Sequence, residues 1–207
     1  MVDSGVRSIR RRARLETIVA AAGAAFRDRG FHTVTLEEIG RTCGVSGPAL
    51  YRYFPTKQHI LFAVFESFED RYEAAETQAS SSAPRAAVEC LVKNSVDMAV
   101  KNGGVYPVLW FTQREYLLDD HRRAVRARQL QHLEFWVRSL SRMRPELTYA
   151  EARTLVHCAL GVISSAVLFE AAITPEALGA LLTRQALTIL TDQAFSTNAL
   201  ADTGEQL

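Results

Sequence analysis

The sequence predicts an all-α protein with a small N-terminal module and a larger helical body. Apolar residues recur three and four positions apart through most of the 207 residues, and the strict alternation of β-strands is absent. Residues that start and stop helices fall between these periodic segments. With 48% hydrophobic and 23% charged residues, the composition is that of a folded globular protein rather than a disordered chain.

The first periodic segment predicts a helix over about residues 9–30. Ile18, Ala22 and Phe26 fall on one face of it, which favours packing against another element. Gly30 follows, and glycine suits the left-handed position just beyond a helix C-terminus.

Two short helices are predicted next. Thr35 and Glu38 form a T-x-x-E capping box, which opens a helix that breaks at Gly44. Ser46 is a natural N-cap for the following helix, and Pro48 is tolerated in its first turn, where amide donors lack helical acceptors. The stretch therefore has two short helices joined by a tight glycine turn.

The rest of the chain also predicts helices. The serine-rich tract 79–84 is the one linker-like segment. Thr148 with Glu151 forms a second capping box, and Thr174 before a proline is typical of a helix start. We expect helices over about residues 56–77, 84–101, 105–117, 119–143, 148–172 and 175–196.

The charges divide the chain into a basic and an acidic part. Residues 1–57 contain ten Lys/Arg and five Asp/Glu, a net charge of +5, whereas residues 58–207 contain fourteen and eighteen, a net charge of −4. Such a division favours a small module that meets a polyanion, with chance clustering as the alternative. We predict two domains with these bounds.

The two short helices have the layout of a helix-turn-helix. Ile39 and Val45 would pack the helices together, and Leu50 would hold the second helix against the first segment. A recognition helix in the major groove needs this arrangement, with its N-terminal turn facing base edges. The residues left on the outer side are Ser46, Gly47, Pro48, Ala49, Tyr51, Arg52 and Tyr53.

At these residues the sequence resembles the TetR family of transcriptional regulators. About 50 residues match at a fixed register, whereas the remainder resembles the family only in length and helical character. The matching positions are Phe26, Gly30, Phe31, Thr33, Val34, Thr35, Ile39, Gly44, Val45, Ser46 and the run Leu50, Tyr51, Arg52, Tyr53, Phe54, Pro55, Thr56 and Lys57.

The resemblance implies a role for several of these side chains. Thr35 would bond a phosphate at a helix N-terminus, and Tyr51, Tyr53 and Lys57 would hold the DNA backbone. Gly40 and Cys43 stand where the family usually has alanine, and because both are small, packing is expected to survive.

The start of the recognition helix would face the bases. Gly47 brings no side chain to the groove, and Pro48 and Ala49 offer only apolar contact, most naturally to a thymine methyl group. Arg52 is the one residue there that can form a bidentate contact with guanine, the alternative being a phosphate. We place Ser46 at the same interface.

A basic arm is expected before the first helix. Such an arm can follow phosphates or enter a narrow minor groove, and the alternative is a solvated tail. The arm contains Arg7, Arg10, Arg11, Arg12 and Arg14, of which Arg10, Arg11 and Arg12 are our candidate DNA contacts.

No catalytic or metal-binding set is found, and we predict neither an enzyme nor a cofactor. The histidines lack metal-ligand spacing and nucleophile motifs, and there is no glycine-rich phosphate loop. His157 lies on an apolar helix, where a core position is expected. The chain contains five histidines, His32, His59, His121, His132 and His157, and three cysteines, Cys43, Cys90 and Cys158.

Composition also bears on location. The cysteines are odd in number and far apart, so no disulfide framework is expected. No apolar run reaches the roughly 18–20 residues that span a bilayer, and no apolar core of a secretory signal follows the N-terminus. We expect a cytoplasmic protein without a membrane partner.

The helical body contains candidates for a small-molecule site. Tyr106, Trp110, Gln113 and Arg114 share one helix face, and Trp136 belongs to the next long helix. Concave, mostly apolar cavities with a few polar groups bind small molecules, although ordinary core packing explains the same aromatics. The region resembles regulators of fatty-acid or steroid breakdown in actinobacteria, which implies an acyl-CoA effector as one class.

The last two helices carry many large apolar side chains with small ones between them. The family resemblance implies that this pair forms a two-fold interface with a second copy, the alternative being a hairpin buried within one chain. The residues concerned are Leu155, Val156, Ala159, Leu160, Ile163, Ala166, Val167, Leu178, Leu181, Leu182, Leu187 and Leu190.

Together these features predict a ligand-responsive transcriptional repressor. It would bind a palindromic DNA operator as a homodimer and be released by a small-molecule effector. One alternative is an activator or an effector-independent regulator. Another, from a different class, is a helical small-molecule-binding protein or enzyme with a vestigial helix-turn-helix. The basic arm and the intact run from Tyr51 to Lys57 argue against that class.

Overall fold

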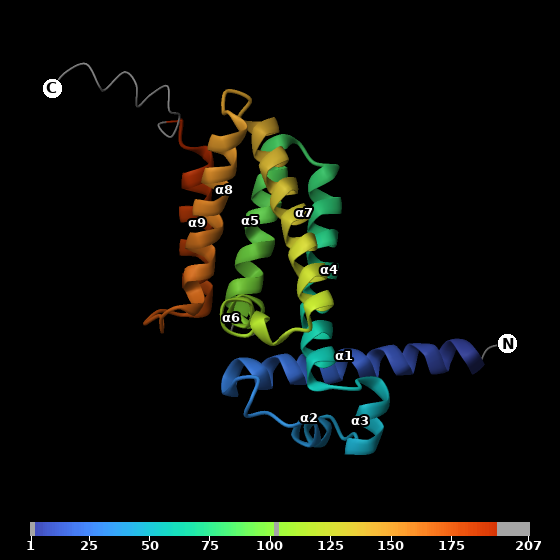
Figure 1. Cartoon of the computed structure of the whole chain (residues 1–207). Coiled ribbons are helices and arrows are strands. Elements are labelled where there is room, and N and C mark those ends of the chain that lie inside the picture. The colour runs from blue at the N-terminus through green and yellow to red at the C-terminus, as the bar shows by residue number, and fades with distance from the viewer. Residues whose placement is uncertain (1–2, 102–103, 194–207) are drawn as a thin grey trace, which may run out of the picture. The chain divides into compact units, whose positions relative to one another are not determined.

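A computed structural model describes residues 3–101 and 104–193, with side chains from Ser8 onward (Figure 1). Every regular element in these ranges is helical, as the sequence predicts. The chain forms two compact units. The first unit contains residues up to Asp70 together with Val105–Arg126, and the second contains Arg71–Gly104 together with residues from Ala127 onward. The predicted functional boundary between residues 57 and 58 stays a prediction.

The first helix, α1 (Asp3–Arg29), is longer than the periodicity predicts. Residues 10–14, expected to form an arm outside the helix, are helical, so the prediction of a non-helical basic arm was wrong. The cause is local, because arginine and alanine have high helix propensity and no glycine or proline interrupts residues 6–22. Arg7 lies in the helix, but its side chain is outside the described residues.

The second and third helices, α2 (Leu36–Thr42) and α3 (Gly47–Tyr53), form as predicted. The capping box at α2 is complete: the Glu38 N–H donates to Thr35 Oγ1 at 3.2 Å, and the Thr35 N–H donates to Glu38 Oε2 at 2.8 Å. Ser46 is the N-cap of α3 but makes no side-chain capping hydrogen bond. Gly44 turns the chain between the helices with φ of 63°, which favours glycine.

The three helices bury a common apolar core, in which α2 packs against both α1 and α3. Phe26 of α1, Ile39 of α2 and Leu50 of α3 are all buried, and Val45 fills the turn between α2 and α3. The side of α3 opposite Leu50 stays in solvent. The orientation of α3 therefore depends on α1 through this core.

The remaining predicted helices also form, with two differences. The segment 105–117 divides at Gln113, and the segment 148–172 stops being α-helical at Ser164, where Ser165 Oγ bonds the carbonyl of Val162. In addition, the last helix ends at Thr191 with Asp192 as its C-cap, so the predicted end at residue 196 was wrong. The elements are α4 (Lys57–Ser80), α5 (Pro84–Val100), α6 (Val105–Thr112), η2 (Arg114–Tyr116), α7 (Asp119–Met143), α8 (Tyr149–Ser164), η3 (Ser165–Val167) and α9 (Pro175–Thr191).

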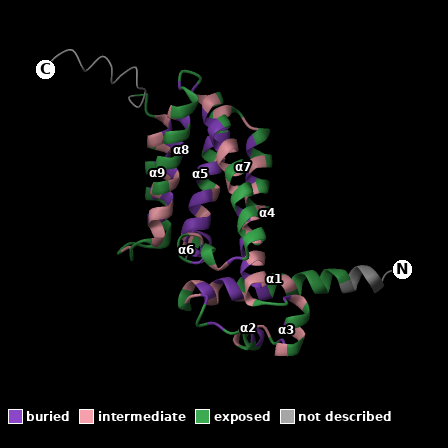
Figure 2. Ribbon diagram, viewed as in Figure 1, coloured by how far each residue is buried: buried purple, intermediate pink, exposed green. Residues whose placement is uncertain are grey.

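In the second unit α5, α8 and α9 pack side by side around one core (Figures 1 and 2). Trp136 and Leu140 of α7 are buried in the same cluster. Most of the large apolar residues that we assigned to an interface between copies are buried here, inside the chain's own core. The buried ones are Leu155, Val156, Ala159, Ile163, Leu178, Leu182 and Leu190.

No helix in the described ranges is both long enough and apolar enough to cross a membrane.

Gly40 and Gly47 generate a test of how tightly the helix-turn-helix is packed. A Cβ at Gly40 would lie 2.6 Å from the backbone oxygen of Val45, whereas a Cβ at Gly47 meets only Glu37 Cγ at 3.6 Å. Gly40→Ala should therefore cost about 1–3 kcal/mol, or roughly 2–10 °C in melting temperature, despite the higher helix propensity of alanine.

Gly47→Ala is the matched control and should keep or slightly raise the melting temperature. Thermal unfolding followed by circular dichroism measures both variants. Equal melting temperatures for the two would contradict the close approach at Gly40.

Candidate functional site

The outer face of α3 is accessible to a ligand. Tyr51 is 48% exposed, Pro48 and Arg52 are also exposed, and Ala49 is half-buried, whereas Leu50 is fully buried against the core. Pro48, Ala49, Tyr51 and Arg52 lie on the side of α3 opposite Leu50 and form one surface with both polar and apolar groups. The predicted base-facing residues thus lie on one accessible face.

The basic part of α1 lies beside this face. The guanidinium of Arg11 is 5.9 Å from the centre of the Tyr53 ring, which brings the N-terminal half of α1 next to the end of α3. Arg10, Arg11 and Arg14 are exposed, while Arg12 pairs with Glu16 at 3.0 Å. The arginines and the recognition helix form one interface of basic and aromatic character.

Thr35 makes its hydrogen bonds within the protein. Its hydroxyl belongs to the capping box, and Glu38 also pairs with Arg29 at 3.1 Å. The backbone N–H of Thr35, and after it Arg29, lower the pKa of Glu38, so this carboxylate is ionised at neutral pH. A phosphate at the start of α2 would share the Thr35 N–H with that carboxylate, and the predicted contact stays a prediction.

The Lys57 ammonium also makes its contacts within the protein. Its Nζ donates to the carbonyl of Val34 at 2.9 Å and to that of His32 at 3.3 Å, and it lies 4.5 Å from the centre of the Phe31 ring. Burial lowers the pKa of this ammonium. Lys57 therefore ties the loop before α2 to the start of α4, and its predicted contact with the DNA backbone stays a prediction.

Four of the five candidate effector residues lie in α6 or directly after it. Tyr106 is buried with its ring edge-on to Phe65 and Phe68 of α4. The guanidinium of Arg114 lies 4.6 Å from the centre of the Trp110 ring and is exposed. This pair presents a cation held on an aromatic face, which suits an anionic group of a ligand.

Gln113 has a contact that the sequence did not indicate. The side chain is 4% exposed, and its Nε2 donates to the backbone carbonyl of Phe26 at 2.6 Å. Helix periodicity placed Gln113 on one face with Trp110, but the partner 87 positions away in the chain carries no local signal. Gln113 thus joins the segment after α6 to the end of α1.

Trp136 belongs to the second unit and is 1% exposed there. Its Nε1 donates to Nε2 of His132 at 3.1 Å, and the other ring nitrogen of His132 bonds Glu76. This chain of bonds satisfies the buried indole and fixes the neutral tautomer of the histidine. The predicted grouping of Trp136 with Trp110 and Arg114 stays a prediction.

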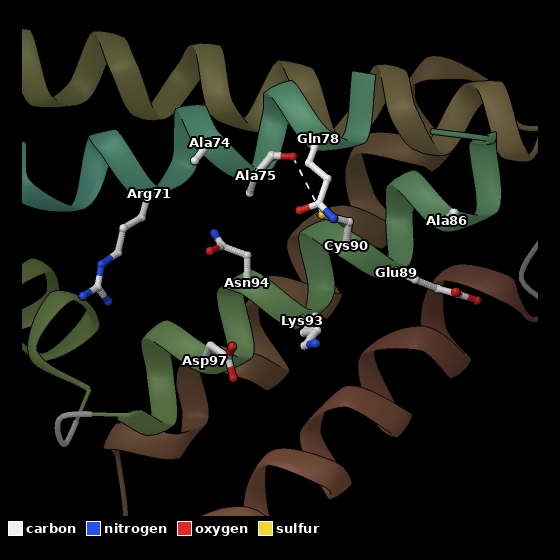
Figure 3. Close-up of a pocket in the computed structure, with 10 residues that line it drawn as sticks. All are labelled: Arg71, Ala74, Ala75, Gln78, Ala86, Glu89, Cys90, Lys93, Asn94 and Asp97. Carbon is white, nitrogen blue, oxygen red and sulfur yellow. Dashed lines mark hydrogen bonds between the residues drawn. The ribbon is translucent and has the colours of Figure 1, made fainter. Parts of the chain in front are cut away.

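A groove that the sequence did not indicate lies between α4 and α5 of the second unit (Figure 3). Its volume is about 490 Å³, and alanines leave space between the two helices. The Cys90 thiol lies on its floor and contacts the carbonyl of Ala75 at 3.8 Å. The lining residues are Arg71, Ala74, Ala75, Gln78, Ala86, Glu89, Cys90, Lys93, Asn94 and Asp97.

His157 and Cys158 lie on the exposed face of α8, so the expectation of a core histidine was wrong. Helix α8 buries Leu155, Val156 and Ala159 instead, and the two positions between them point outward. All three cysteines are free thiols, and no group of three metal-ligating side chains occurs among the described residues.

Comparisons with known proteins agree with this site. Residues 18–64 match the family model described as "Bacterial regulatory proteins, tetR family". The nucleoid occlusion factor SlmA of Actinobacillus pleuropneumoniae serotype 5b (strain L20) is 29% identical over 134 residues, which are 61% of this chain and 64% of that protein. The match thus spans less than two thirds of that relative's length.

Solved structures share the fold across most of the chain. The complex of AibR with isovaleryl coenzyme A and operator DNA superposes with a TM-score of 0.70 at 15% identity, over 83% of this chain and 97% of that one. The ketosteroid transcriptional regulator KstR2 of Mycobacterium tuberculosis gives a TM-score of 0.67 at 19% identity, over 86% and 92%.

The family match covers the module that carries the exposed recognition helix, and the likeness in fold extends over both units. Residues 18–64 thus match the DNA-binding module of the tetR family of bacterial regulatory proteins, and the chain shares its fold with solved TetR-family regulators.

Proposed function

We propose that the protein is a ligand-responsive transcriptional repressor that binds a palindromic DNA operator as a homodimer. The observation that supports this most directly is the single surface made by the exposed face of α3 and the arginines of α1. A helix-turn-helix needs an exposed second helix for the major groove and cations for the flanking phosphates. A vestigial module would not need to keep both.

In this proposal the start of α3 reads bases and its surroundings hold the backbone. Gly47, Pro48 and Ala49 face the groove with Ser46, and Arg52 supplies the guanine contact. The backbone contacts come from Thr35, Tyr51, Tyr53 and Lys57, and from Arg10, Arg11 and Arg12 on α1. Because α1 is helical at these arginines, they would follow phosphates along a rigid helix rather than enter the minor groove as a flexible arm.

The homodimer would form through α8 and α9. Since their large apolar residues fill the chain's own core, the mating surface consists of the outward positions. On α8 these include His157, Cys158 and Gly161, and on α9 they include Ala180 and Leu181. Small residues at these positions would allow the helices of two copies to approach closely. The two-fold symmetry of such a dimer would place its two α3 helices about 34–36 Å apart, in successive major grooves.

The effector would contact Tyr106, Trp110, Gln113 and Arg114, with Trp136 as a further candidate. An acyl-CoA is the class that we favour, because the cation of Arg114 on Trp110 suits an anionic group beside an apolar one. The AibR structure with isovaleryl coenzyme A and operator DNA shows that a protein of this fold binds such molecules. The effector would act by binding better to a dimer whose recognition helices do not fit the operator.

Selection from random double-stranded DNA by the full-length protein tests operator binding. The expected result is an enriched inverted repeat.

Arg52→Ala should relax the preference at one base pair of each half-site, at a cost of about 1–3 kcal/mol for the best sequence. Arg10→Ala should weaken all sequences alike and reduce the salt dependence by a slope of about 0.9. Unchanged selectivity of Arg52→Ala would place Arg52 on a phosphate.

Leu181→Glu tests the dimer. Leu181 is 36% exposed on α9, and a carboxylate in a two-fold interface meets its own symmetry mate, so the variant should sediment as a monomer and lose binding to a two-half-site operator. Leu130→Glu is the control, because Leu130 is 49% exposed on α7 and outside the proposed interface. Analytical ultracentrifugation measures both. A dimeric Leu181→Glu would show that α9 does not form the interface.

Tryptophan fluorescence tests the effector class. Acyl-CoAs and the matched free acids are titrated into the wild type and into Trp136→Phe, in which Trp110 is the only indole. Binding beside Arg114 should quench Trp110, and Arg114→Met should weaken binding of the anionic ligands about tenfold. Absence of a response to every chain length would exclude acyl-CoAs. A reporter gene then distinguishes repression from activation.

A further inference from the structure

The end of α1 is held by two hydrogen-bond donors on one carbonyl. The Phe26 carbonyl accepts the Gly30 N–H at 2.9 Å, which closes the helix, and also Nε2 of Gln113 at 2.6 Å. The second donor comes from the residue that links α6 to η2. The point where α1 passes into the loop before α2 is thereby tied to a distant part of the chain.

The other end of the Gln113 amide has no partner. Its Oε1 is buried and makes no hydrogen bond to any described residue. An unpaired buried acceptor lowers stability, whereas an apolar side chain of the same shape would carry no such cost. A glutamine that served only to fill space here would be a poor choice, so the value of this side chain lies in the donor that it offers to Phe26.

Further ring contacts join the same segment to the loop before α2 and to α4. The Tyr116 ring stacks on Phe31, with centres 5.1 Å apart and planes at 14°, and meets His32 edge-on at 4.4 Å. His121, in the first turn of α7, stacks on Phe62 of α4 at 4.0 Å. Residues 113–121, which we name the coupling segment, therefore contact elements on both sides of α2 and α3.

We propose that Gln113 is a positioning residue for DNA binding, an inference that rests on the proposed function. Through its bond to Phe26 the coupling segment sets the direction in which α1 ends and the loop 30–35 begins. That loop leads into α2, and α2 carries α3 through their shared core. Gln113 thus acts on the recognition helix without contacting DNA.

The same side chain offers a route for an effector signal. Gln113 lies three positions after Trp110 and directly before Arg114, so a ligand bound at these two side chains would lie close to the amide. Because Oε1 has no partner, a ligand group that donates a hydrogen bond to it would bind the same carboxamide whose Nε2 holds Phe26 and would so couple the ligand to that bond. The favoured effectors are then those with a hydroxyl or amide N–H as well as an anionic group.

Two substitutions at position 113 separate positioning from stability. Gln113→Met removes both the donor and the unpaired oxygen, so its melting temperature should stay close to that of the wild type, while operator affinity falls about fivefold. Gln113→Glu keeps the shape but cannot donate while ionised, and should weaken operator binding by more than tenfold at about pH 8.

The pH profile of Gln113→Glu is specific to the proposed bond. Burial raises the pKa of the introduced carboxyl, and below that pKa its O–H can donate to the Phe26 carbonyl. Operator affinity of the variant should therefore recover toward the wild type at about pH 5.5, relative to the wild type at the same pH. Amide hydrogen exchange at Gly30, whose N–H shares the carbonyl, should slow in parallel.

Glu73→Gln, an exposed carboxylate of α4 outside the coupling segment, is the control and should leave affinity and exchange unchanged. A wild-type chain that enriches no DNA sequence would overturn the proposed function and this inference together. A wild-type operator bound equally well by Gln113→Met, or a Gln113→Glu variant without recovery at low pH, would overturn the inference alone.

Discussion

The packing of the loop 30–35 between α1 and α2 is the constraint on which the DNA-binding face depends. Lys57 donates to two carbonyls of this loop, and Gln113 donates to the carbonyl at which α1 ends. Both donors are charged or polar groups taken partly or wholly out of water, so each is held by its hydrogen bonds. The shared apolar core joins α1, α2 and α3, and these two donors add fixed points along the loop and at the end of α1.

This arrangement explains why the helix-turn-helix is not packed as an isolated module. The first unit takes in Val105–Arg126 as well as the N-terminal helices, and beside its apolar core the contacts of this segment include aromatic stacks and a buried amide. Such contacts have defined geometry and few alternative arrangements. Under the proposals above, a movement of this segment would change the direction of α3, which suits a dimer whose two recognition helices match the spacing of an operator.

The helices and the recognition motif were predictable because their signals are local. Capping boxes, glycine turns and apolar periodicity involve residues within four positions of one another, and they located α2, α3 and α8 closely. The start of α1 was missed, because arginine-rich segments carry no apolar stripe although they favour helix. Most of the apolar residues of α8 and α9 that we assigned to an interface between copies lie in the chain's own core, because periodicity shows that a helix has an apolar face but not which partner covers it.

The sequence by itself determined an all-helical chain and an exposed recognition helix with its candidate DNA contacts. Only the tertiary structure decided that Gln113 bonds Phe26, that Lys57 serves the loop before α2, and that the apolar faces of α8 and α9 close on their own chain. The physical reason is distance along the chain. A hydrogen bond between residues 26 and 113 cannot be recognised from the residues next to either position, because it forms only when several helices pack together.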